Sequence, residues 1–318
     1  MKNGFDEFIG GVLDGADVDE FKRNRQGKIV GTVIWTIGLV MFLLTFVFVI
    51  IMAATDRPDS IFNTTISIGF LGMIIVIVGV IISSVYSGKN ARIINRYKAK
   101  IIDFLLKGKI YTYEQNSFIS RNNFTTSPFY SGKTIDTFKG EDYLRINVPN
   151  DDGTASGYYF TVSDIMAEHE YTDSDGDKHT ETVFSGVFGY IDFPFNFKHT
   201  LAINRNMVKK RKLERVRLED IAFNNAFKVW CDDQIEARYI LTPEVMAKLK
   251  RLKASFGNIQ IVLNGHTLYF AAPYKNLFAI SSRAKTLNAA AFSRVEQDVT
   301  ALSEFVSEIA RNNKVFKI

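Results

Sequence analysis

The segment Ile29–Ala54 reads IVGTVIWTIGLVMFLLTFVFVIIMAA and contains no charged residue. A second charge-free segment covers Ile61–Gly88. Each exceeds the roughly 20 apolar residues that cross a hydrocarbon core about 30 Å thick. Because backbone polar groups in lipid must bond to one another, both segments are predicted to be helices, and residues 29–88 to form a transmembrane hairpin.

Core helices of soluble proteins and signal peptides are two other origins of long apolar segments. Core helices rarely stay free of charge over such a length. A signal peptide has a basic flank, whereas acidic residues come first here: Asp6, Glu7, Asp14, Asp17, Asp19 and Glu20. Apolar residues at helical spacing predict an amphipathic helix within an N-terminal segment, residues 1–28, that rests on the membrane or on a domain: Phe5, Phe8, Ile9, Val12 and Leu13.

The charges that flank the hairpin predict its orientation. Basic residues precede the first segment and follow the second: Lys22, Arg23, Arg25 and Lys28, then Lys89, Arg92, Arg96, Lys98 and Lys100. Because Lys and Arg stay on the cytoplasmic side, we expect a multi-pass cell-membrane protein whose N-terminus and C-terminal domain are cytoplasmic. The single cysteine cannot form an internal disulfide, which agrees with that compartment.

The hairpin is interpreted as an anchor, because proton relays and ion pathways usually need a charged residue within the span. Its glycines allow the two helices to approach closely: Gly31, Gly38, Gly69, Gly72 and Gly79. Association of several hairpins into a homo-oligomer stays open.

The residues after the hairpin change character twice. Residues 89–108 form a basic amphipathic segment, predicted to be a juxtamembrane helix that Gly108 ends. Residues 109–318 then alternate strand patterns with turn signals, such as Asp175-Gly176 and Asn264-Gly265. Strands in runs with helices at the ends predict a cytoplasmic α+β domain with an antiparallel sheet and flanking helices.

The stretch VWCDDQIEARYILTPEVMAKLKRL, from Val229 to Leu252, looks like an active site but is interpreted as architecture. A short strand is followed by a helix that Asp232 or Asp233 caps. Thr242 and the proline after it are typical of a second helix start, whose apolar stripe includes Leu249.

No catalytic residue and no cofactor site is predicted. Cys231 has no histidine near it in the sequence, and two aspartates follow it, so its pKa should be raised and its thiol unreactive. The SGKT at Ser131–Thr134 lacks the glycine that a phosphate loop needs five residues earlier.

Two histidines are candidate metal ligands. His169 and His179 lie across the predicted hairpin, where cross-strand ligation is one hypothesis. The YTDSDGD between them has its glycine out of register for a calcium loop, so a solvated turn is favoured.

One basic run is a candidate lipid or anion patch. It comprises Lys209, Lys210, Arg211, Lys212, Arg215 and Arg217. A basic patch tethered beneath an anionic leaflet can contact lipid headgroups. Nucleic-acid binding is disfavoured because the run lacks interleaved aromatic residues, and a solvated turn remains an equal alternative.

The C-terminal half resembles an uncharacterised family of two-span bacterial membrane proteins, domain of unknown function three-one-three-seven. The residues that carry the resemblance are LEDIAFNNAFKVWCDDQIEARYILTPEVMAKLKRL, then IQIVLNGHTLYFA, and more faintly VFSGVFGYIDFPFNF. The resemblance implies a membrane topology and a cytoplasmic domain, but no reaction and no catalytic residues.

Three functions therefore remain, in order of preference. The first is a membrane-anchored binding or scaffold protein whose cytoplasmic domain recruits a protein partner or senses the membrane surface. The second is an enzyme with an unrecognised, metal-dependent site around His169 and His179. The third is a membrane tether for nucleic acid.

Overall fold

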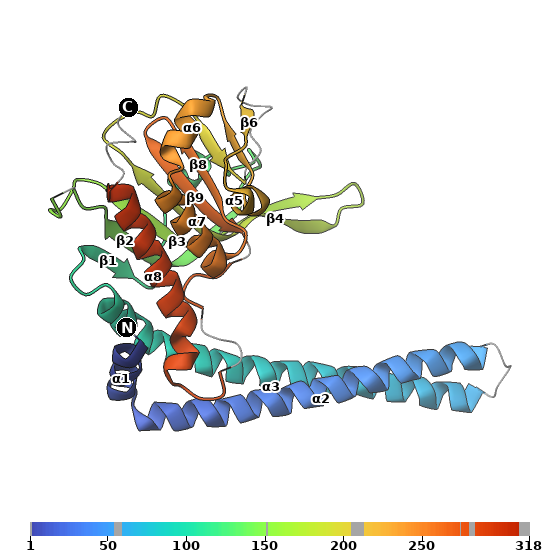
Figure 1. Cartoon of the computed structure of the whole chain (residues 1–318). Coiled ribbons are helices and arrows are strands. Elements are labelled where there is room, and N and C mark those ends of the chain that lie inside the picture. Colours follow the sequence, from blue (N-terminus) through green and yellow to red (C-terminus); the bar gives the residue numbers. More distant parts are fainter. Residues whose placement is uncertain are drawn as a thin grey trace. The chain divides into compact units, whose positions relative to one another are not determined.

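The computed structural model describes residues 2–53, 59–150, 152–204, 213–273, 275–279 and 284–311. The chain divides into two compact units (Figure 1). The first contains residues 1–97 and 281–292, and the second contains residues 98–280 and 293–318.

Three helices supply most of the first unit: α1 (Lys2–Val12), α2 (Gly15–Ala53) and α3 (Asp59–Leu105), whose last residues belong to the second unit. The first is the amphipathic helix expected from the sequence, because Phe5 and Ile9 are buried. The Asp14 carboxylate accepts the Ala16 N–H at 2.9 Å, which satisfies a free amide at the start of α2.

Helices α2 and α3 are each long and apolar enough to cross a membrane. Large apolar side chains point outward along both, and Leu44 and Phe70 are 64% and 65% exposed. Within the most apolar windows, only 11% of α2 and 22% of α3 is buried. A core helix of a soluble protein would bury most of that surface, so these two helices do not form such a core.

Glycines bring α2 and α3 together. Gly31 and Gly38 lie seven residues apart on α2, and Gly72 and Gly79 lie seven apart on α3, the spacing of a heptad seam. A Cβ added at Gly79 would lie 2.4 Å from the Trp35 backbone nitrogen and 2.8 Å from the Gly31 oxygen. The backbones therefore approach too closely for any side chain at this position, as the sequence predicted.

The second unit is built on one antiparallel sheet. Among the described residues, nine strands pair in the order β1-β2-β3-β4-β9-β8-β5-β7-β6. Their bounds are β1 Tyr111–Glu114, β2 Thr137–Asn147, β3 Tyr159–Thr172, β4 Lys178–Asp192, β5 Leu201–Ile203, β6 Glu214–Val216, β7 Val229–Cys231, β8 Gln260–Asn264 and β9 Thr267–Pro273. The Asp175-Gly176 turn joins β3 to β4, and Asn264-Gly265 joins β8 to β9, as expected from their sequences.

Helices cover one face of this sheet (Figure 1). The bounds are α5 Ile221–Ala226, α6 Gln234–Ile240, α7 Pro243–Phe256 and α8 Ala289–Arg311. The Phe256 ring of α7 lies 5.6 Å from Phe270 of β9, and the Phe305 ring of α8 lies 6.1 Å from Phe160 of β3. The opposite face packs against α4 (Arg121–Thr125), whose Phe124 contacts Phe188 of β4 edge to face.

The architecture is therefore α+β: two long apolar helices followed by an antiparallel sheet with flanking helices, as predicted. The last residues of α3 are also as expected. Ile101 and Ile102 are buried, α3 ends at Leu105, and Gly108 follows with a φ of +81°, in the left-handed region that favours glycine.

The stretch from Val229 to Leu252 forms the strand and the two helix starts that the sequence predicts. The Asp233 carboxylate caps α6 by accepting the Ile235 and Glu236 N–H groups at 2.7 and 2.9 Å. The Thr242 hydroxyl caps α7 by accepting the Val245 N–H at 3.3 Å. Two helix starts thus follow one another, and both depend on the side chains that the sequence singled out.

Candidate functional site

A kink in β2 places a carboxylate inside the second unit. The pairing of β2 with β3 shifts between Glu141 and Leu144, which is a β-bulge. Asp142 at this bulge has a φ of +60°, a conformation that Asp tolerates better than most residues. Its N–H donates to the Gln115 carbonyl at 2.8 Å, outside the sheet ladder. The bulge thereby turns the Asp142 side chain inward, where it is fully buried.

Two neighbours satisfy the buried Asp142 carboxylate. The Lys98 ammonium lies 2.6 Å from one oxygen, and its side chain is itself almost fully buried. The Tyr113 hydroxyl donates to the other oxygen at 2.6 Å. Burial, and then the nearby Asp142 charge, raise the pKa of Tyr113 well above its usual range, so this hydroxyl stays a donor.

A second carboxylate lies beside the first on β3. Asp164 accepts the Leu277 N–H with both oxygens, each at 2.8 Å. The pKa of Asp164 is raised to about 7, chiefly by burial and also by the charges of Asp142 and Glu141, whereas the Leu277 amide and Lys98 oppose the shift. The acid therefore exchanges its proton near neutral pH.

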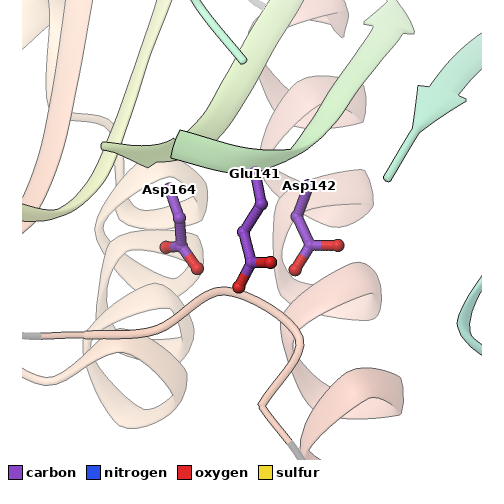
Figure 2. A group of neighbouring side chains, drawn as sticks. All are labelled: Glu141, Asp142 and Asp164. Carbon is purple, nitrogen blue, oxygen red and sulfur yellow. The ribbon is translucent and has the colours of Figure 1, made fainter. Parts of the chain in front are cut away.

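Oxygens of Glu141, Asp142 and Asp164 all lie within 4.8 Å of one another. Figure 2 shows the three side chains extending in the same direction, toward the coil that follows β9. The Lys98 ammonium already supplies the positive charge that such a group needs, and it occupies an Asp142 oxygen. We therefore assign this acidic cluster a structural role rather than a metal site.

A further buried acid lies on α8. The Asp298 carboxylate accepts the Ser255 hydroxyl at 2.6 Å and the Phe278 N–H at 3.2 Å, and the Lys275 ammonium lies 3.4 Å away. Burial raises the pKa of Asp298 above its usual range, although these partners oppose the shift. Asp164 and Asp298 thus bind neighbouring amides of one short segment.

The acidic cluster was not anticipated from the sequence. Asp142 and Asp164 lie on two different strands, and the third acid that faces the strap, Asp298, lies on α8, so no local sequence pattern links them. The sequence does contain aspartates within strand patterns and Asp298 on the apolar side of a helix pattern, which are unusual places for a charge. Neither feature identifies the residues that bond to these carboxylates.

The two candidate metal ligands of the β3–β4 hairpin lie on either side of one tyrosine. The rings of His169 and His179 stack on Tyr171 at centroid distances of 6.0 and 5.4 Å. Each histidine contacts its own carboxylate, His169 that of Asp136 at 2.9 Å and His179 that of Asp173 at 2.6 Å. Metal ligation by this pair stays a prediction.

The basic run lies partly outside the described residues. Lys209, Lys210, Arg211 and Lys212 fall there. Arg215 and Arg217 are exposed at the edge strand β6, where the guanidinium of Arg215 lies 5.1 Å from the Trp230 ring centroid. Lipid or anion binding by the run stays a prediction.

The surroundings of the single cysteine match the expected unreactive thiol. Cys231 is buried, and burial is the main cause that raises its pKa to about 11. The fold does bring a histidine near it that the sequence keeps distant. His199 lies 3.2 Å from Asp232, and the Cys231 sulfur lies 3.7 Å from the same carboxylate. A buried thiol with a raised pKa is a poor nucleophile even when a histidine and a carboxylate lie close to it.

Residues 182–311 match a family model described as a protein of unknown function, DUF3137. The match covers less than half of the chain, so the chain is similar to this family over that part. The resemblance inferred from the sequence is thereby confirmed, and it covers the strands and helices from β4 to α8. It includes Leu277 and Asp298 but not Asp142 and Asp164.

Comparisons with characterised proteins add little. No curated protein matches the chain. The crystal structure of the mycobacterial trehalose monomycolate transport factor A, TtfA, is 8% identical, has a TM-score of 0.31, and aligns with 67% of this chain and 95% of its own. A similarity of that size says nothing about function.

Proposed function

We propose that this protein is a membrane-anchored binding protein, in which α2 and α3 span the membrane and carry an α+β domain on the cytoplasmic side. The observation that supports it most is the outward apolar surface of both helices, of which only 11% and 22% is buried in their most apolar windows. In water such a surface would drive aggregation, whereas in a bilayer the apolar side chains contact the hydrocarbon chains of the lipid.

The charges at the ends of the helices support the orientation. Lys22, Arg23, Arg25 and Lys28 precede the apolar segment of α2, and five basic residues follow that of α3 within residues 89–100. The short connection between the helices has one arginine and two aspartates. The excess of basic residues therefore favours the cytoplasmic side for both ends of the hairpin.

Binding is favoured over catalysis by how the ionisable groups are arranged. Among the described residues, Asp142 is bonded by Lys98 and Tyr113, and Asp298 by Ser255 and Phe278. Buried groups satisfied in this way stabilise a unique fold, whereas a catalytic acid or base faces space for a substrate.

Reporter fusions test the topology. Two reporters are used, one active only in the cytoplasm and one active only outside the cell. Each is fused after Ile318, and in matched controls each is inserted between Arg57 and Pro58. We expect cytoplasmic activity at the first site and external activity at the second. External activity after Ile318 would reject the orientation and the cytoplasmic domain with it.

Purification from detergent-solubilised membranes tests the binding role. A stoichiometric protein partner is expected. Bound metal would instead favour the enzyme alternative, and nuclease-sensitive material would favour a nucleic-acid tether. The variant His169→Ala/His179→Ala separates the first two outcomes, because it should abolish metal retention and leave a protein partner in place.

A further inference from the structure

The segment Lys275–Ala279, here called the strap, follows β9 and is held tightly for a coil. Leu277 and Phe278 are fully buried. Phe278 has a φ of +52°, which is unusual for a bulky residue and persists only where the surroundings enforce it. The Phe278 ring also meets the Tyr113 ring edge to face at 6.0 Å.

Two carboxylates, the half-buried Asp164 and the buried Asp298, hold successive amides of the strap. Asp164 accepts the Leu277 N–H at 2.8 Å, and Asp298 accepts the Phe278 N–H at 3.2 Å. Asp298 has two further partners, Ser255 and Lys275. In contrast, the Leu277 amide is the one group among the described residues that donates a hydrogen bond to Asp164, and no ammonium bonds to this carboxyl there.

The surroundings of Asp164 disfavour its ionisation. Asp142 and Glu141 on β2 place their carboxylate oxygens within 4.8 Å of those of Asp164. The positive charge nearby is the Lys98 ammonium of α3, which bonds to Asp142, and Tyr113 of β1 is neutral and also bonds to Asp142. Three carboxylates that share one ammonium retain a proton, because like charges this close resist simultaneous ionisation.

We propose that the strap is a proton-controlled clasp: it closes over a protonated Asp164, and ionisation of Asp164 loosens it. Both Asp164 oxygens lie 2.8 Å from the Leu277 nitrogen, so the carbonyl oxygen of the neutral acid still accepts this amide, and the neutral acid adds no third charge to the acidic cluster. Loss of the proton places a negative charge under two buried apolar side chains, and opening of the strap admits the water that solvates it.

The shifted acidity of Asp164 places the response near neutral pH. Its pKa in the closed protein is raised to about 7, chiefly by burial. Opening removes part of that burial and therefore lowers the pKa, so the closed state loses stability as the pH rises through this range. The clasp goes beyond the proposed binding function and is independent of membrane insertion.

Hydrogen exchange of the full-length protein in detergent tests the clasp. Exchange of the Leu277 and Phe278 amides is measured at pH 6 and pH 8, and each rate is corrected for the intrinsic effect of pH. For a closed-state pKa near 7 and a much lower open-state pKa, protection should fall about tenfold between these pH values. The amides of β8 serve as the internal reference for global opening.

Two variants and one control sharpen the result. Asp164→Asn cannot ionise, so its strap should be as protected at pH 8 as the wild-type strap is at pH 6. Glu141→Gln removes one like charge at an exposed position, so Asp164 should ionise more easily. The pH at which the strap loses protection should therefore shift to lower values. Asp192→Asn alters an exposed carboxylate and should leave the response unchanged.

The wild-type measurement alone can overturn the proposal. Protection that is equal at pH 6 and pH 8 would do so, as would protection that rises with pH, since the Leu277 bond to the ionised acid would then dominate. An equal loss in β8 would show global unfolding rather than a local clasp. An Asp164→Asn protein that keeps the wild-type response would assign the titration to another group.

Discussion

At the scale of single residues, Asp164 makes the fold sensitive to pH. Its pKa is raised to about 7 in the folded protein, chiefly by burial, and is about 3.9 in an unfolded chain. Between these values the folded state holds a proton that the unfolded state has lost, so the free energy of unfolding falls as the pH rises. A shift of this size corresponds to at most about 4 kcal/mol.

Asp164→Asn should therefore stabilise the protein at pH 8 and have little effect at pH 4. Denaturant unfolding of the full chain in detergent measures the difference, with Trp230 fluorescence as the signal in a Trp35→Phe background. A variant that is less stable than wild type at pH 8 would show that the Leu277 hydrogen bond outweighs burial.

The buried ion pair between Lys98 and Asp142, which lies next to Asp164, gives a separate prediction. Lys98→Met leaves the Asp142 carboxylate buried without its cation, and such a loss costs about 3–5 kcal/mol. Adding Asp142→Asn should restore part of the stability, because the amide tolerates the left-handed backbone and carries no charge. The matched control is Arg251→Met, which breaks the exposed pair with Glu304 and should cost less than about 1 kcal/mol.

At the scale of elements, the contact between α2 and α3 depends on glycine. A Cβ at Gly79 would lie 2.4 Å from the Trp35 nitrogen, whereas one at Gly88 would meet nothing within 4 Å. Gly79→Ala should force the helices apart and lower the thermal midpoint of the detergent-solubilised protein. Gly88→Ala should leave it unchanged, and equal midpoints for the two variants would show that the seam is not packed as described.

The start of α7 gives a graded test of the second unit. The Thr242 hydroxyl caps this helix, and its loss in Thr242→Ala should cost about 1 kcal/mol. Leu249 is 1% exposed, and Leu249→Ala should cost about 2–5 kcal/mol through the cavity it leaves. Denaturant unfolding measures both, and negligible effects at both positions would mean that α7 does not pack on the sheet.

At the scale of the whole molecule, local sequence patterns predicted most of the longer helices and strands and the order in which they follow one another. Apolar length identified α2 and α3, the Asp-Gly and Asn-Gly turns identified two hairpins, and Thr242 identified a helix start. The short strands β1 and β6 were missed, because three or four residues carry too little pattern. The acidic cluster was missed because it joins residues from distant elements, and its identity depends on a bulge at Asp142 that no local pattern marks.

The basic run makes the last prediction, because a tethered domain samples the headgroup region at high effective concentration. If Lys209–Lys212 contact lipid headgroups, trypsin should cut there more slowly in nanodiscs of anionic lipid than in neutral ones. The protection should disappear with salt, as the Debye length falls from about 10 Å at 0.1 M to about 3 Å at 1 M. Lys178, exposed at the β3–β4 turn, is an internal control whose cleavage should not depend on lipid charge.

The alternatives for the run give different results. A solvated turn is cut equally fast in both nanodiscs at every salt concentration. A nucleic-acid site is protected by added oligonucleotide even in neutral lipid. Changing Lys210 and Lys212 to Gln leaves Lys209 and Arg211 as cleavage sites. Protection at these two sites should weaken only if the attraction is electrostatic and shared along the run, because each basic residue near the surface contributes about 1 kcal/mol.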